Sequence, residues 1–206
     1  MTPEDFLDAV RDETRTPLSR LGSSKSLYAD TAGEMEPDAV VAAAIADERA
    51  AAQTFETWAE DTDGPLGDAF ADAATVAREH ADELESATDA ESPEASTMYA
   101  ALADLDGTVA RLGGFVGRSL VTKKKADQRT GFFVGQADPQ TSRLFRGFAD
   151  DIDAQIEQAS DLLAGQCDSD SDWETAEEAA VEIVEAAYDE YVETLEGMGV
   201  NPKDVC

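Results

Sequence analysis

Residues 37–87 read PDAVVAAAIADERAAAQTFETWAEDTDGPLGDAFADAATVAREHADELESA and contain the clearest periodic pattern in the chain. Apolar residues recur at spacings of three and four on both sides of the turn near 61–64, which predicts a helical hairpin. Glu48 lies within the apolar stripe of the first arm, and His80, the single histidine, lies within that of the second. In an antiparallel pair Glu48 falls opposite Ala77, one turn of ~5.4 Å from His80. We therefore expect a carboxylate and an imidazole in one layer of a small-residue core.

The same helical periodicity extends over the rest of the chain, and prolines mark most of the helix starts. We expect N-caps at Thr2, Ser92 and Asp138, and an interruption of the first helix at Pro17, which lacks a backbone N–H. The only candidate strand is the short 131–134 segment. The prediction is an all-α antiparallel bundle of about six helices in a single domain, residues 1–206. The domain begins with an N-terminal helix (1–30), followed by three core helices (37–123), the last of which begins at Pro93. A basic loop (124–138) leads to the last two helices (139–198), expected at 139–164 and at about 173–195. Residues 199–206 form a tail.

Composition points to a salt-adapted protein. The 206 residues include 46 acidic and 15 basic side chains, for a formal net charge of −31, and the acids are spread over every predicted helix. Such a charge destabilises a compact fold through self-repulsion, which molar salt screens. We therefore expect a cytoplasmic protein of an extreme halophile. The sequence contains neither a membrane-spanning apolar run nor a signal peptide, so no membrane partner is expected. Cys167 and Cys206 are expected to be free thiols.

The polar residues of the hairpin indicate a family. Residues 46–50, ADERA, place a lone Glu on the first arm, and residues 77–84, AREHADEL, place His on the second. These stretches resemble the ferritin-like, rubrerythrin-like helical proteins, in which one helix supplies Glu and its hairpin partner supplies Glu-x-x-His. The resemblance implies a degenerate, halophilic, archaeal-type member. The connection at 86–92 is shorter than the long crossover of that fold, so both a ferritin-like and an up-and-down bundle stay open.

The predicted metal ligands are too few for a two-metal centre. Ala77 stands where the resemblance requires a carboxylate, and Asp106, at the edge of its stripe, is the nearest candidate on a later helix. Glu83, three residues after His80, is the available replacement, which makes Glu48, His80 and Glu83 the candidate set. We expect no cofactor here, with bound iron, manganese or zinc as the alternative.

A second candidate site is the basic segment 111–146, which holds eight of the fifteen basic residues. Phe132 and Phe133 accompany it, and basic groups with aromatics are typical of surfaces that bind phosphate backbones and bases. The other interpretation is that the segment contacts the protein's own acidic helices or a second copy in a homo-oligomer. The anion-binding or nucleic-acid-binding candidates are Arg118, Lys123, Lys124, Lys125, Arg129, Arg143 and Arg146.

Three functional hypotheses follow from these patterns. The first is a non-catalytic binding or structural protein of the ferritin-like type that has lost its two-metal site. The second is a nucleic-acid-associated, transcription-regulatory protein that acts through residues 111–146. The third is a metal-binding oxidoreductase that takes its missing ligands from Glu83, from Asp106 or from another subunit.

Overall fold

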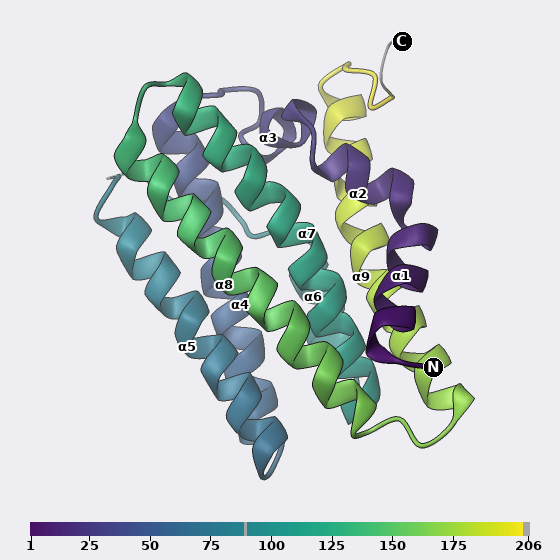
Figure 1. Cartoon of the computed structure of the whole chain (residues 1–206). Coiled ribbons are helices and arrows are strands. Elements are labelled where there is room, and N and C mark those ends of the chain that lie inside the picture. The colour runs from purple at the N-terminus through teal and green to yellow at the C-terminus, as the bar shows by residue number, and fades with distance from the viewer. Residues whose placement is uncertain (89, 204–206) are drawn as a thin grey trace.

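The computed structural model describes residues 1–88 and 90–203, and the regular structure within them is helical throughout (Figure 1). The predicted all-α class is confirmed, whereas nine helices occur in these residues where about six were expected. Their bounds are α1 Pro3–Glu13, α2 Arg15–Leu21, α3 Ser24–Asp30, α4 Pro37–Glu60, α5 Pro65–Glu85, α6 Met98–Asp104, α7 Thr108–Gly135, α8 Pro139–Ala164 and α9 Asp170–Gly197.

Two long helical hairpins form the centre of the molecule. Helices α4 and α5 pack side by side, as do α7 and α8, and α9 packs along the other side of α7 (Figure 1). Between the hairpins the chain crosses the length of the bundle through residues 86–107, which include α6. Helices α5 and α7 consequently run in the same direction. The expectation that 86–92 is a short link between antiparallel neighbours is therefore wrong: after α5 ends at Glu85, the next helix in the described part of the chain begins only at Met98.

The N-terminal region forms three short helices in place of the single helix expected over residues 1–30. The predicted interruption is confirmed: α1 ends at Glu13, and Pro17 lies in the first turn of α2. At that position the missing N–H of proline costs no helical hydrogen bond, so a new helix starts just before it. Gly22 and Ser23 then separate α2 from α3. All three helices contact α9; α1 also contacts α8, whereas α2 and α3 contact α7.

Helix α7 corrects two expectations about the middle of the chain. Its 28 residues run without a break through the expected loop at 124–138 as far as Gly135, and they include the expected strand at 131–134. The segment is helical because its inward side chains, Lys125, Arg129 and Phe133, are all buried against other helices. These tertiary contacts outweigh the weak helix propensity of the glycines nearby.

Several helix ends agree with the capping pattern. Thr2 caps α1 in a reciprocal capping box with Asp5, and the Asp138 carboxylate accepts from the backbone N–H groups of Gln140 and Thr141 at the start of α8. Ser92, by contrast, caps no helix, because residues 92–97 are not helical. The proline there lies in the crossover. Helix α8 has the bounds that the sequence predicts, and α9 begins at Asp170, three residues earlier than expected.

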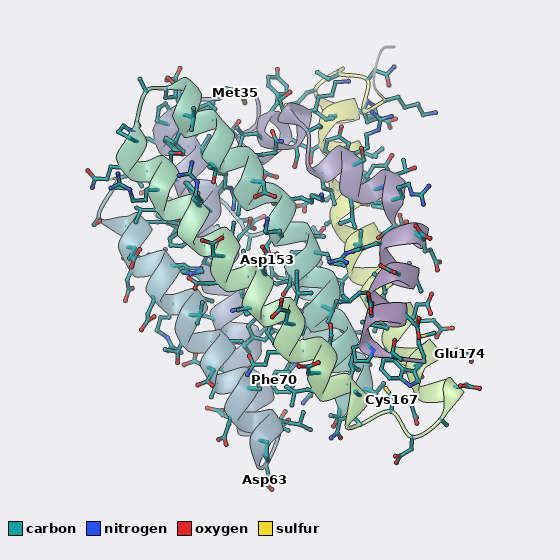
Figure 2. The ribbon with its side chains drawn as sticks, viewed as in Figure 1. Met35, Asp63, Phe70, Asp153, Cys167 and Glu174 are labelled. Carbon is teal, nitrogen blue, oxygen red and sulfur yellow. The ribbon has the colours of Figure 1, made fainter. Side chains whose placement is uncertain are left out.

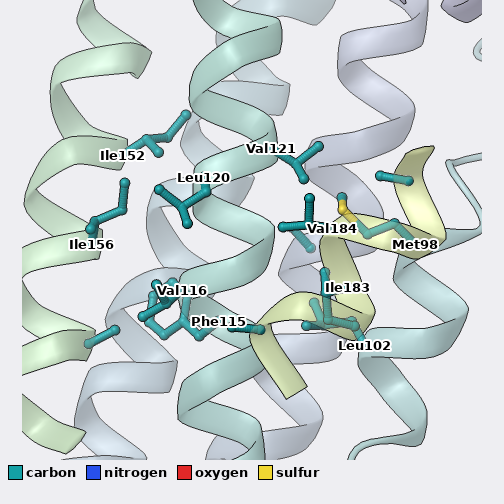
Figure 3. Packing of buried hydrophobic residues seen from close by; sticks show 14 of the residues in the cluster. Met98, Leu102, Phe115, Val116, Leu120, Val121, Ile152, Ile156, Ile183 and Val184 are labelled. Atoms are coloured by element: carbon teal, nitrogen blue, oxygen red, sulfur yellow. The ribbon is translucent and has the colours of Figure 1, made fainter. Parts of the chain in front are cut away.

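The hydrophobic core joins α7 to helices on both sides of it. Figure 3 shows Ile152 and Ile156 of α8 on one side of α7, with Ile183 and Val184 of α9 on the other. Met98 and Leu102 of the crossover helix α6 reach the same cluster. In the same cluster, aromatic side chains of α4, α5 and α7 pack together, and the Phe55 and Phe115 ring centroids lie 4.6 Å apart.

Glycines on α7 allow its close approach to α9. A Cβ built on Gly113 would lie 2.1 Å from the Ala176 carbonyl oxygen, and one built on Gly117 would lie 2.4 Å from that of Ala180. The two glycines are four residues apart and so lie on one face of the helix. Backbone thus meets backbone at this interface, and α9 can cover the core only because both positions lack side chains.

We expect Gly117→Ala to lower the free energy of unfolding by about 1–3 kcal/mol, because the two helices must separate to admit the methyl group. Gly131→Ala on the same helix is the matched control, since a Cβ there meets nothing within 4 Å. That change should raise stability by about 0.5–1 kcal/mol through helix propensity. Denaturant unfolding of both variants in molar KCl measures the difference. Equal effects of the two changes would contradict the close packing of α7 on α9.

Two further expectations concern membranes and cysteines. Among the described residues, no helix is both long enough and apolar enough to span a membrane. Cys167 is a free thiol, located in the connection between α8 and α9 at the end of the molecule where Asp63 marks the α4–α5 turn (Figure 2). Cys206 lies outside the described residues.

Candidate functional site

Glu48 of α4 and His80 of α5 meet inside the bundle as the sequence predicts. Each residue is only 5% exposed, and His80 Nδ1 lies 3.8 Å from Glu48 Oε2. This separation is an ion-pair contact and is longer than a hydrogen bond. The hairpin register places both side chains on its inner face, so the pair faces the second hairpin rather than solvent.

Helix α7 contributes the third member of this layer, Arg118. Its side chain is 1% exposed, and one terminal nitrogen lies 3.2 Å from Glu48 Oε2. The other terminal nitrogen lies 3.4 Å from Gln155 Oε1 of α8. A guanidinium therefore bridges the two hairpins, in contact with a carboxylate on one side and an amide oxygen on the other.

Helix α8 completes the layer around the imidazole. His80 Nε2 lies 3.1 Å from Asp151 Oδ2, and the ring stacks on Phe148 with their centroids 3.8 Å apart. Each helix of the two hairpins, α4, α5, α7 and α8, thus places a polar or charged side chain at one level. We call this set, Glu48, His80, Arg118, Asp151 and Gln155, the central layer.

The charges of the central layer stabilise one another. Burial alone would raise the pKa of the Glu48 carboxyl, but the neighbouring Arg118 and His80 outweigh it and hold the pKa below its ordinary value. Burial likewise opposes protonation of His80, yet Glu48 and Asp151 raise the pKa of the imidazole above its ordinary value. The layer therefore favours an ionised carboxylate beside a protonated imidazole and a guanidinium.

A second buried ionic cluster lies about two to three turns farther along α7 than Arg118. Arg129 donates to Asp47 over 3.0 Å, and Lys125 donates to Asp30 of α3 over 2.9 Å. Lys125 is also 3.8 Å from Asp47, and Arg129 is 3.6 Å from Asp30. Burial opposes ionisation of Asp47, but Lys125 and Arg129 hold its pKa below the ordinary value. We call these four residues the upper cluster, and they join α3 and α4 to α7.

The structure separates the predicted basic residues into two groups. Arg118, Lys125 and Arg129 are buried and paired with the protein's own acids, and half-buried Lys123 pairs with Asp127 and Asp153. The interpretation that the segment contacts acidic helices of the same chain is confirmed for these four. The exposed residues are Lys124, Arg143 and Arg146.

The predicted metal set is not brought together as a trio. Glu83 is exposed on the outer side of α5, away from the buried Glu48 and His80, and Asp106 is exposed just before α7 begins. Among residues 1–88 and 90–203, no three His, Cys, Asp or Glu side chains are placed so that they could hold a metal ion together. At the central layer the positive groups beside Glu48 are Arg118 and His80.

Four acidic or polar members of these layers escaped the sequence interpretation: Asp30, Asp47, Asp151 and Gln155. Two of them had a signal. Asp47 follows a continuous apolar run, which marks a helix buried on several faces, and Gln155 lies three residues after Ile152 in the apolar stripe of α8. No sequence pattern distinguishes Asp30 or Asp151, because both are partly exposed and resemble the many solvated acids of the chain.

The stability of the fold is expected to fall as the pH rises from about 6 through the raised pKa of His80. An imidazole with a higher pKa in the folded state stabilises the fold fully below its unfolded pKa and loses this effect above its folded pKa. Over this interval Glu48, with its lowered pKa, and Arg118, with its raised pKa, both keep their charges. Denaturant unfolding at several pH values measures the trend. His80→Gln is the control and should flatten it; an unchanged slope would refute the assignment.

Fold and site together define an all-α protein whose two central hairpins are joined by buried ion pairs. Comparison with known proteins finds no matching family model, no matching curated protein and no matching solved structure. The function is therefore inferred from the geometry of the central layer.

Proposed function

We propose that this chain is a non-catalytic helical protein of the ferritin-like type, with a binding or structural role, in which internal ion pairs replace a two-metal site. The observation that carries the proposal is the position of Arg118. Its guanidinium lies between Glu48 and Gln155, and it shares the Glu48 Oε2 oxygen with His80. A metal ion at this level would lie beside a buried, fixed positive charge, and its main carboxylate ligand would already be neutralised.

Two features of the fold support the ferritin-like part of the proposal. Ferritin-like bundles have one long crossover between two helix pairs, and residues 86–107 form such a connection between α5 and α7. Those bundles also direct polar side chains from all four helices into one layer. In the central layer α4 and α5 supply Glu48 and His80, while Arg118 and Gln155 stand on α7 and α8, where further acidic or imidazole ligands would be required.

Metal analysis of protein purified in molar KCl tests the proposal. We expect iron, manganese and zinc far below one ion per chain, with no change on His80→Ala. Arg118→Glu, which replaces the guanidinium by a carboxylate, is the informative variant, because gain of metal would identify Arg118 as the group that excludes it. Stoichiometric metal in the natural chain, lost on His80→Ala, would favour the oxidoreductase hypothesis, with ligands from Glu83, Asp106 or another subunit.

One observation favours nucleic-acid binding as a second candidate function. Arg143 and Arg146 are exposed on α8, next to the end of α7 where Val134 is 60% exposed, and neither has an ion pair in the described part of the chain. Binding of RNA or DNA in the working salt should then weaken on Arg143→Gln with Arg146→Gln. Lys125 is unsuitable for this test, because its replacement would disturb the buried upper cluster. Absent or unaffected binding would remove this candidate.

A further inference from the structure

We propose that the cavity between α3, α4, α9 and the crossover binds a small organic cation that carries ammonium groups on an alkyl chain. The cavity has a volume of about 450 Å³, which is within the usual range for small-molecule sites. It lies away from the central layer and is a separate site, which the proposed function does not use. Five segments distant in the sequence enclose it, including residues 90–96 and one side chain of α7.

The inner wall of the cavity is made by small apolar side chains and the upper cluster. Ala42 and Ala43 of α4 are buried there, and seven of the lining residues are alanines. Tyr191 of α9 lines the opposite side and donates its hydroxyl to the Pro202 carbonyl. A short alkyl chain can therefore bury its methylene groups against these walls, away from water. A hydrated inorganic ion has no apolar part to bury.

The charge around the cavity selects the sign of the ligand. Eight of its lining residues are acidic, whereas Lys125 is its only basic lining residue among those described. Lys125 is buried and already bound by Asp30 at 2.9 Å and Asp47 at 3.8 Å, so it leaves no positive charge for an anionic ligand. The remaining acidic lining residues come from three separate segments, and all but half-buried Glu190 are exposed: Glu34, Glu36, Asp38, Glu91, Glu94 and Glu190.

The crossover wall is held in place by one of these acids. Glu190 of α9 accepts hydrogen bonds from the Ser96 hydroxyl, at 2.5 Å, and from the Thr97 backbone N–H, at 3.2 Å. Glu91 and Glu94 are exposed on the same wall and have no ion pair in the part of the chain that the structure describes. Together with Glu34, Glu36 and Asp38, which are also exposed, they are carboxylates available to ammonium groups, while the apolar inner wall accommodates the alkyl chain.

Calorimetric titration of the full chain with spermidine in molar KCl tests this proposal. We expect saturable binding of one spermidine per chain, with Kd raised at least about tenfold by the double change Glu91→Gln with Glu94→Gln. The matched control is Glu174→Gln with Glu178→Gln, which removes the same charge from exposed positions of α9 outside the cavity. Its Kd should equal that of the natural chain.

Three outcomes would overturn the proposal: no saturable binding, equal weakening by the cavity pair and the control pair, or complete suppression when KCl is raised at constant spermidine. The second would show diffuse attraction to an acidic surface, and the third would show that binding depends on charge attraction that salt removes, with no contribution from burial of the alkyl chain. Ala43→Leu, which fills the inner wall, should also abolish binding if circular dichroism shows that it folds. If that variant does not fold, Glu91→Gln with Glu94→Gln still tests the proposal, because both positions are exposed. None of these results depends on metal content, which tests the proposed function separately.

Discussion

Replacement of Arg118 by methionine is expected to lower the free energy of unfolding by about 3–5 kcal/mol, the largest effect of any single change considered for this protein. The reason is that Glu48 would stay buried with no partner closer than His80, whose nearest nitrogen is 3.8 Å away. A desolvated carboxylate without a close counter-charge is far less stable in the fold than in water. Gln155 would also lose the donor that its amide oxygen accepts from.

The control for Arg118→Met is Arg146→Met, since Arg146 is exposed on α8. We expect that change to alter stability by at most about 0.5 kcal/mol. The double variant Arg118→Met with Glu48→Leu should recover most of the loss, because a buried ion pair replaced by apolar side chains of similar size is often neutral. Denaturant unfolding in molar KCl measures all three. A cost for Arg118→Met as small as that of the control would mean that the central layer does not hold the hairpins together.

The melting temperature is expected to rise steeply between low and molar KCl. The excess acidic side chains, which give a formal net charge of −31 over 206 residues, repel one another. At low ionic strength this repulsion reaches across the whole molecule. Molar salt shortens the screening length to about 3 Å and removes most of this term. Each kcal/mol of repulsion relieved raises the melting temperature of a domain of this size by about 2–4 °C. Several kcal/mol are available from a charge this large.

Calorimetric melting over a series of KCl concentrations measures the effect, with sucrose as the control for general stabilisation by excluded cosolvents. Neutralising exposed acids such as Glu174 and Glu178 by glutamine should flatten the KCl dependence. The cost of Arg118→Met should stay nearly the same at every KCl concentration, because buried pairs are screened much less than exposed charges. A melting temperature indifferent to KCl would remove the argument for a halophilic protein.

Much of the architecture could be predicted from local pattern. Helices α4, α5 and α8 begin at Pro37, Pro65 and Pro139, where the proline and capping pattern places them, and Glu48 meets His80 as the hairpin register requires. These features depend on residues close in sequence, whose periodicity and end signals act within a few turns. The crossover was mispredicted because Pro93 resembles a helix start, although α6 begins only at Met98.

The partners of the basic residues could not be predicted in the same way. Arg118, Lys125 and Arg129 belong to the segment 111–146 that the sequence suggests as anion-binding, yet each points inward from one continuous helix to an acid located 70 or more residues away. Nothing in their immediate neighbourhood distinguishes a lysine that binds phosphate from one that binds a buried aspartate. The choice depends on which helix packs opposite.

Local sequence was therefore sufficient for the all-α class, for the ends of several helices and for the carboxylate–imidazole pair, because each follows from spacing along one helix or across one tight hairpin. Only the packing of the two hairpins placed Arg118 between Glu48 and Gln155, joined Asp30 and Asp47 to α7 and left the acidic cavity beside the crossover. The physical reason is range: helix periodicity acts over a few residues, whereas a buried charge is stable only where a counter-charge from a distant segment meets it.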